Sequence, residues 1–138
     1  MKNHSAPNGA DEHASDPRLP ARVLFDVGDP LEGPTLVVFA GIHGNEQSGL
    51  ESVRRLARAI EHDQVAIRGR ILAVTGNRQA IARNQRFIDR DLNRRWGRTT
   101  TDEPVTAEDE EQRQLVEILN SCTAFSDFFN ADWRKHWR

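Results

Sequence analysis

The pattern of apolar and polar stretches along the chain predicts a protein of alternating strands and helices. Residues 22–27 (Arg-Val-Leu-Phe-Asp-Val) read as a strand, and residues 36–40 (Leu-Val-Val-Phe-Ala) are apolar at every position. A strand that is apolar throughout is typical of one covered on both faces, as in the middle of an α/β sheet. By the same argument, residues 71–74 (Ile-Leu-Ala-Val) form a second buried strand.

Two helices are expected between and after these strands. Within residues 46–60, apolar side chains recur at helical spacing and form one stripe, which consists of Leu50, Val53, Leu56, Ala57 and Ile60. Thr106 and Asp109 form a capping box at the start of the second helix, and the acidic residues 108–111 suit a helix N-terminus. This helix continues to about residue 120, with a core face of Leu115, Val116, Ile118 and Leu119.

Strands that alternate with helices predict an α/β fold with a mostly parallel sheet flanked by helices. Composition divides the chain into a leader, a domain and a tail. Residues 1–20 hold three of the prolines among mostly polar residues, which predicts a disordered leader because such a segment buries too little to offset its ordering entropy. Residues 21–120 form the domain, residues 77–98 within it are irregular and rich in arginine, and residues 121–138 are a divergent tail.

Charge and cysteine content narrow the possible classes. The formal net charge is −2, which gives no general attraction to nucleic acid or to an anionic membrane. A single cysteine, Cys122, excludes an internal disulfide and is most simply a buried small hydrophobic residue. No apolar run approaches the roughly 20 residues of a membrane span, and the N-terminus has no apolar core of a secretion signal. We therefore expect a cytoplasmic protein with no membrane partner.

His43 and Glu46 follow the apolar strand 36–40, at the position where open α/β sheets place their ligand sites. Zinc binds imidazole nitrogen and carboxylate oxygen, and a catalytic zinc commonly has two histidines and one glutamate as ligands. The pattern His-x-x-Glu at a strand-to-helix corner lets both side chains reach one ion. On its own, the same pattern also describes a surface histidine beside a glutamate at the start of a helix.

A second group of candidate residues lies between positions 86 and 94. Arg86, Asn93 and Arg94 fall within nine positions of a loop after a buried strand. Arginine binds a carboxylate through two parallel hydrogen bonds, and asparagine adds a neutral donor, so the group is a plausible anion site. Taken alone, the alternative is a basic loop that faces water.

In order and separation, the two groups resemble the motifs of a known family. Residues 41–46 (Gly-Ile-His-Gly-Asn-Glu), then Asn77-x-x-Ala80, then residues 86–94 (Arg-Phe-Ile-Asp-Arg-Asp-Leu-Asn-Arg) resemble the aspartoacylase and succinylglutamate desuccinylase family. That family belongs to the wider zinc carboxypeptidase-like group, and the resemblance spans residues 36–119. It implies a zinc-dependent hydrolase that cleaves the amide or ester bond of an N-acylated amino acid or a similar small carboxylate.

The resemblance also implies a metal site that extends past the end of this sequence. His43 and Glu46 correspond to the first two zinc ligands, and Asp91 to the carboxylate that orients the ligand histidine. The family's third ligand, in an Asp-x-His strand end, and its glutamate general base lie further downstream. His136 stands at nearly the right distance, but its surroundings do not read as a buried strand, which favours a surface histidine. We therefore expect a truncated chain of low activity.

The remaining implied roles concern the substrate. Arg86 corresponds to the catalytic arginine that polarises the scissile carbonyl and binds its oxyanion, and Asn93 and Arg94 join it in holding the substrate carboxylate. Two alternatives stay open. One is a catalytically dead remnant, and the other is nucleic-acid binding through a basic stretch, which Asp89 and Asp91 interrupt. That stretch consists of Arg78, Arg83, Arg86, Arg90, Arg94, Arg95 and Arg98.

Overall fold

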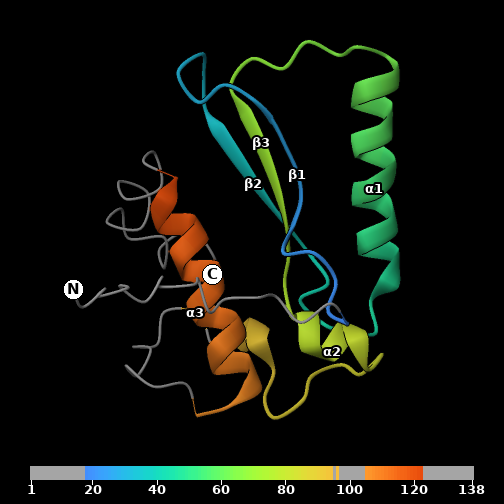
Figure 1. The fold of residues 1–138 in the computed structure, drawn as a ribbon, viewed down its shortest axis with the longest axis vertical. Helices are drawn as coiled ribbons and strands as arrows, with labels where there is room; N and C mark the ends of the chain where they lie inside the picture. The colour runs from blue at the N-terminus through green and yellow to red at the C-terminus, as the bar shows by residue number, and fades with distance from the viewer. Residues whose placement is uncertain (1–17, 95, 97–104, 123–138) are drawn as a thin grey trace, which may run out of the picture.

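A computed structural model describes residues 18–94, 96 and 105–122. The predicted leader up to residue 17, the tail from residue 123 with His136, and the basic residues 95 and 98 fall outside the described residues. Figure 1 shows the described elements in order: β1 (Val23–Gly28), β2 (Thr35–Ala40), α1 (Gln47–His62), β3 (Arg70–Thr75), α2 (Arg78–Ala82), the 3₁₀ helix η1 (Leu92–Arg94) and α3 (Ala107–Ser121).

The three described strands form one mixed sheet in the order β1-β3-β2. The α/β class is confirmed, but the expectation of a mostly parallel sheet is wrong for these strands, since β3 pairs parallel with β2 and antiparallel with β1. The reason lies in the connections. The short loop at 29–34 reverses the chain between β1 and β2, whereas the parallel pair β2–β3 uses a helical crossover through α1.

The strand in the middle of this sheet is β3, and β2 lies at an edge of the described sheet. Leu72, Ala73 and Val74 of β3 are at most 3% exposed, as expected for a buried strand. The prediction that residues 36–40 are covered on both faces is wrong within the described residues, because Leu36 of β2 is 58% exposed. As an edge strand, β2 has a neighbouring strand on one side only, although its composition is apolar throughout. Apolar composition alone therefore did not distinguish the central strand from an edge strand.

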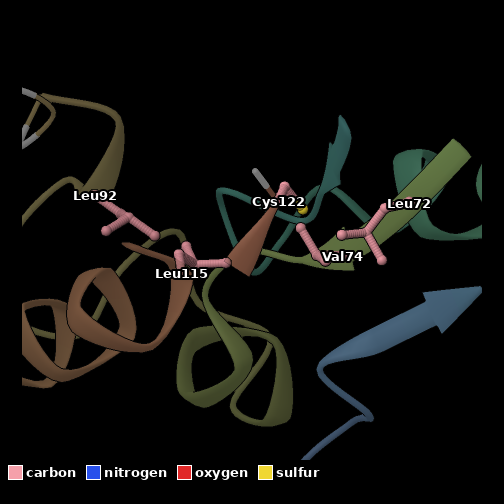
Figure 2. Close-up of a cluster of buried hydrophobic side chains, with 5 residues drawn as sticks. All are labelled: Leu72, Val74, Leu92, Leu115 and Cys122. Carbon is pink, nitrogen blue, oxygen red and sulfur yellow. The ribbon is translucent and has the colours of Figure 1, made fainter. Parts of the chain in front are cut away.

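Helices lie on both faces of the sheet at β3 (Figure 1). Successive side chains of a strand point to opposite faces, so neighbouring residues of β3 pack in different clusters. On one face, Ala73 packs in a cluster with Leu50 and Val53 of α1 and with Ala40. On the other face, β3 contributes to a cluster that includes α3 and η1 (Figure 2), consisting of Leu72, Val74, Leu92, Leu115 and Cys122. The expected burial of Cys122 is confirmed at 3% exposure.

Both predicted helices form, with changes in what they bury. In α1 the apolar stripe is buried at Leu50 and Val53 and partly buried at Ala57 and Ile60, but Leu56 is 43% exposed. In α3 the capping box of Thr106 and Asp109 is present as predicted. Its core face holds Leu115 and Leu119, whereas Val116 and Ile118 are only partly buried.

Two of the acidic residues at the start of α3 are buried. Glu108 and Glu111 are 0% and 2% exposed, so their carboxylates face the protein interior. Glu111 forms an ion pair with Arg22 and accepts a hydrogen bond at 3.0 Å from the backbone N–H of Gln79, the second residue of α2. Arg22 also donates to the carbonyl oxygens of Thr75 and Gly76 at 2.7 and 2.6 Å. This ion pair therefore connects α3 to the end of β3.

Among the described residues, no helix is long and apolar enough to cross a membrane.

We predict that Glu111→Ala lowers the free energy of unfolding by about 3 kcal/mol, because it leaves the Arg22 guanidinium buried without its carboxylate partner. Urea unfolding followed by circular dichroism measures the change. Glu51→Ala on α1 is the control, since Glu51 makes ion pairs only with exposed arginines and its substitution should change the stability far less than Glu111→Ala does. Equal effects of the two substitutions would contradict the structural role of the Arg22–Glu111 pair.

Candidate functional site

The site begins at a corner where the chain leaves β2. Gly41 has a φ of +69°, and the backbone N–H of Asn77 donates to the Gly41 carbonyl at 2.8 Å, so the ends of β2 and β3 remain joined here. Gly44 lies against the segment that follows α2. A Cβ on Gly44 would come within 2.1 Å of the Ala80 carbonyl carbon and 2.4 Å of the Gln85 carbonyl oxygen. Only glycine permits this close approach of the two backbones.

This approach brings the corner that carries His43 against the segment that carries Arg86. The Gly44 N–H donates to the Arg86 carbonyl oxygen at 3.2 Å, and the Glu46 N–H donates to the His43 carbonyl oxygen at 3.1 Å. Residue 46 is the N-cap of α1, so its side chain projects from the end of the corner. Two segments about forty residues apart in the sequence thus meet at the carboxyl end of β2.

The imidazole of His43 lies between two carboxylates. His43 is 7% exposed, its Nδ1 is 2.9 Å from Glu46 Oε1, and its Nε2 is 2.9 Å from Asp91 Oδ1. A neutral imidazole has a single N–H and can donate to only one of these carboxylates. Each ring nitrogen of His43 therefore has a carboxylate oxygen within hydrogen-bond distance, and Glu46 and Asp91 together fix the orientation of the ring.

Asp91 is held by several donors. Its Oδ1 also accepts the backbone N–H of Asn93 at 3.0 Å, and its Oδ2 lies 3.7 Å from Arg86 Nη2 and 3.6 Å from Arg94 Nε. Burial raises the pKa of Asp91, but the hydrogen bonds from His43 and Asn93 and the nearby charges outweigh it, so the net pKa is lowered. Asp91 is therefore a stable acceptor for the His43 ring.

The two arginines line the open side of this arrangement. Arg86 Nη1 lies 4.0 Å from Glu46 Oε1, and the side chains of Arg86 and Arg94 are 51% and 84% exposed. Their guanidinium groups are accessible to an incoming anion, while the carboxylates of Glu46 and Asp91 lie close behind them. Asn93 is exposed and contributes its backbone N–H to Asp91.

The geometry permits a test of whether the residues fit a zinc ion. Two ligand atoms of a tetrahedral zinc, each about 2.0–2.1 Å from the ion, lie roughly 3.3 Å apart. The 2.9 Å between His43 Nδ1 and Glu46 Oε1 is close to that value, so a small shift admits the ion. Within the described ranges, no group of three or more His, Cys, Asp or Glu side chains is arranged to hold a metal. The described part therefore fits two ligands of a zinc site.

Two buried polar residues that support this site have roles that the sequence analysis did not assign. Glu108 accepts hydrogen bonds from the backbone N–H groups of residues 88, 89 and 90, and from the Asn77 side chain at 2.9 Å. Asn77 also caps α2, because its Oδ1 accepts the Ala80 N–H at 3.0 Å. A signal for Glu108 existed. Glu108, Glu111 and Leu115 recur at helical spacing, which places two carboxylates on the apolar face of α3.

Other candidates lie away from the site. His62 is exposed at the end of α1, as a surface histidine would be, with its side chain 88% accessible. A pocket of about 540 Å³ is lined by Arg18, Leu19, Gln79, Ala82 and Arg83, and none of these is a predicted zinc or substrate residue, although Arg83 belongs to the basic stretch.

The chain belongs to the succinylglutamate desuccinylase/aspartoacylase catalytic domain family, whose pattern matches residues 32–133. Among curated relatives, it is 29% identical over 102 residues to a succinylglutamate desuccinylase of Photorhabdus laumondii, covering 74% of this chain and 31% of that protein. It is 42% identical over 62 residues to a succinylglutamate desuccinylase of Ectopseudomonas mendocina, covering 45% of this chain and 18% of that protein. The chain thus spans less than a third of the length of these relatives.

Solved structures give the same family. The chain is similar to the succinylglutamate desuccinylase of Chromobacterium violaceum, with a TM-score of 0.57 and 26% identity over 65% of this chain and 28% of that one. It is also similar to the succinylglutamate desuccinylase of Vibrio cholerae, with a TM-score of 0.53 and 28% identity over 65% of this chain and 26% of that one. The family resemblance read from the motifs is confirmed.

We predict that the stabilising effect of Glu108 disappears in acid. Burial raises the pKa of Glu108, but its four hydrogen bonds outweigh burial and leave the pKa below the ordinary value of 4.5. A lowered pKa means that the ionised carboxylate stabilises the fold above the ordinary value, and that this contribution is lost as the pH falls through the lowered value. Glu108→Gln should therefore lower the free energy of unfolding by about 2–3 kcal/mol at pH 7.

Urea unfolding of the wild type and Glu108→Gln at pH 7 and at pH 3 measures this effect, and the difference between them should shrink in acid. Glu117→Gln is the control, because Glu117 lies on the same helix with its side chain 61% exposed. A difference of the same size at both pH values would show that ionisation of Glu108 does not stabilise the fold.

Proposed function

We propose that this chain carries the zinc-binding and carboxylate-binding part of a deacylase that hydrolyses the amide or ester bond of an N-acylated amino acid. The observation that carries the proposal is the buried His43 ring between Glu46 and Asp91, with Arg86 and Arg94 on the accessible side. Family membership and relatives named succinylglutamate desuccinylase support this class of reaction. We extend the proposal to a zinc carboxypeptidase-like fold for the complete domain.

In this proposal, His43 Nδ1 and the Glu46 carboxylate hold a zinc ion, which when bound activates water and polarises a carbonyl group. Asp91 accepts the Nε2 proton of His43, which fixes the tautomer and makes Nδ1 the better electron-pair donor. A third ligand and a general base would come from outside the described residues, since within them no third His, Cys, Asp or Glu joins this pair in a metal-binding group.

Arg86, Asn93 and Arg94 take the substrate in this proposal. A guanidinium group binds a carboxylate through paired hydrogen bonds, and Arg86 stands close enough to Glu46 to reach a carbonyl oxygen near the ion as well. Arg86 would therefore stabilise the oxyanion, while Arg94 and Asn93 hold the substrate carboxylate. The substrate class is a small acylated amino acid, for which N-succinyl-glutamate is the first choice because the relatives' names specify it.

Nucleic-acid binding by the basic stretch is less well supported. Arg78 is 8% exposed and donates to the Pro20 carbonyl oxygen, and Arg86 and Arg94 face Asp91. Arg78 is therefore withdrawn from the surface, and the Asp91 carboxylate offsets part of the positive charge of Arg86 and Arg94. A remnant that has lost catalysis is distinguished from a deacylase by the experiments that follow.

Zinc binding tests the metal site directly. We predict that the chain binds Zn²⁺ in isothermal titration calorimetry, with affinity at least about tenfold lower in His43→Ala, because one of the two ligands that the described residues offer is lost. His62→Ala is the matched control, since His62 is exposed and lies at the far end of α1. The zinc affinity of this variant should equal that of the wild type. Zinc binding that survives His43→Ala unchanged would refute this site.

Substrate binding tests the anion site. With Zn²⁺ present, we predict that Arg86→Ala weakens binding of N-succinyl-glutamate roughly tenfold or more, because one charged hydrogen-bonding group is lost. The affinity of Arg86→Lys should lie between those of the wild type and Arg86→Ala, since lysine keeps the charge but not the paired donors. Chemical-shift titrations give the affinities, with Arg55→Ala on the exposed face of α1 as the control. An equal affinity of Arg86→Ala and wild type would exclude Arg86 from the substrate site.

A further inference from the structure

We propose that Glu108 is a positioning residue for the candidate site: its buried carboxylate holds segment 88–90 and thereby sets where Asp91 meets His43. The catalytic meaning of this inference rests on the proposed function. The placement of the His43–Asp91 pair, in contrast, is a property of the fold and is measurable without a metal.

The first observation is how closely Glu108 binds the segment before Asp91. Its Oε1 accepts the Ile88 N–H at 2.7 Å, and its Oε2 accepts the Asp89 and Arg90 N–H groups at 2.9 and 3.1 Å. Three successive backbone donors bound to one carboxylate leave the segment little freedom to rotate. Asp91 is the next residue, so its backbone position is fixed by the same carboxylate.

The same carboxylate also reaches the corner that carries His43. Glu108 Oε1 accepts Asn77 Nδ2 at 2.9 Å, and the Asn77 backbone N–H donates to the Gly41 carbonyl oxygen at 2.8 Å. Gly41 stands two residues before His43 in the sequence. Glu108 is therefore connected to both halves of the His43–Asp91 contact, to one directly and to the other through Asn77.

The contacts distinguish this role from ordinary stabilisation of a helix end. A glutamate in the first turn often favours a helix by interacting with the helix's own N–H groups. The hydrogen bonds that the Glu108 carboxylate accepts come instead from outside α3. The segment 88–90 also binds the first turn of α3 through its own side chain, since Asp89 Oδ2 accepts the Ala107 N–H at 2.9 Å. The first turn of α3 thus serves as the support on which the site segment rests.

Leu92 adds an apolar anchor on the far side of Asp91. It is fully buried in the cluster that includes Leu115 of α3 (Figure 2). The segment therefore contacts α3 on both sides of Asp91, through the Glu108 hydrogen bonds before it and through the apolar packing of Leu92 after it. Removing the hydrogen bonds should make Asp91 more mobile without removing the apolar core.

Glu108→Gln is the sharpest substitution, because it keeps the shape of the side chain. A glutamine has one acceptor oxygen, and its amide nitrogen would face N–H donors in place of the second oxygen. Glu117→Gln is the matched control for the loss of one negative charge on the same helix, since the Glu117 side chain is 61% exposed and pairs with Arg113.

The full chain is examined without metal by NMR, with two readouts. Amide hydrogen exchange of residues 88–90 reports the segment, and the His43 ring nitrogens and the Nε2 proton report the contact with Asp91. In Glu108→Gln we expect exchange of these amides to be at least about tenfold faster and the His43 ring signals to shift, with both unchanged in Glu117→Gln. A role limited to global stability would leave the His43 ring signals of the folded protein where they are.

Unchanged exchange and unchanged ring signals in Glu108→Gln would overturn the proposal. If that variant does not fold, native-state exchange of the wild type decides. The amides of residues 88–90 must then open together with those of the first turn of α3 as denaturant rises, and independent opening would overturn the proposal. A Zn²⁺ titration separates the two hypotheses: wild type that binds no zinc counts against the proposed function alone, whereas binding about tenfold weaker in Glu108→Gln than in Glu117→Gln supports both.

Discussion

Two carboxylates buried under the first turns of α3 are the constraint on which the rest of this structure depends. Glu108 and Glu111 are almost fully removed from water, and a charge in that position is unfavourable unless donors surround it. The protein supplies those donors from segments distant in sequence: a guanidinium before β1, one backbone N–H of α2, and backbone N–H groups of the segment after it. Satisfying the two charges therefore assembles the parts of the chain that form the site.

The site follows from this assembly together with one apolar contact. While α3 holds the segment 88–90, Leu92 packs in the core and Asp91 contacts the His43 ring. The corner itself is set by β2 and β3, whose parallel pairing aligns their carboxyl ends. The carboxyl end of the sheet, a helix and a connecting segment therefore each contribute one part of the candidate site, and no single segment contains the whole site.

Sequence patterns predicted the local features well, because those depend on nearby residues. The capping box at Thr106, the helical span of α1 and the burial of β3 all follow from short-range periodicity and capping chemistry. The order of the strands was not predicted, since the apolar character of residues 36–40 is the same for an edge strand and a central one. Helix α2 was missed because it is five residues long and its cap is the side chain of Asn77. The motifs around His43 and Arg86 indicated the family, whereas the inward direction of Glu108 depends on tertiary contacts that charge alone does not reveal.

The absence of a side chain at Gly44 has a consequence for the mechanical character of the site. A Cβ there would overlap the carbonyl carbon of Ala80, so the two segments touch backbone to backbone. The spacing between the His43 corner and the Arg86 segment is consequently set by main-chain atoms in direct contact, which include the hydrogen bond from the Gly44 N–H to the Arg86 carbonyl oxygen, with no flexible side chain as a spacer. Such a contact has no rotamers through which to relax. Warming should therefore leave the separation nearly constant until the two segments part altogether, so that the geometry is lost in a single step rather than by gradual loosening.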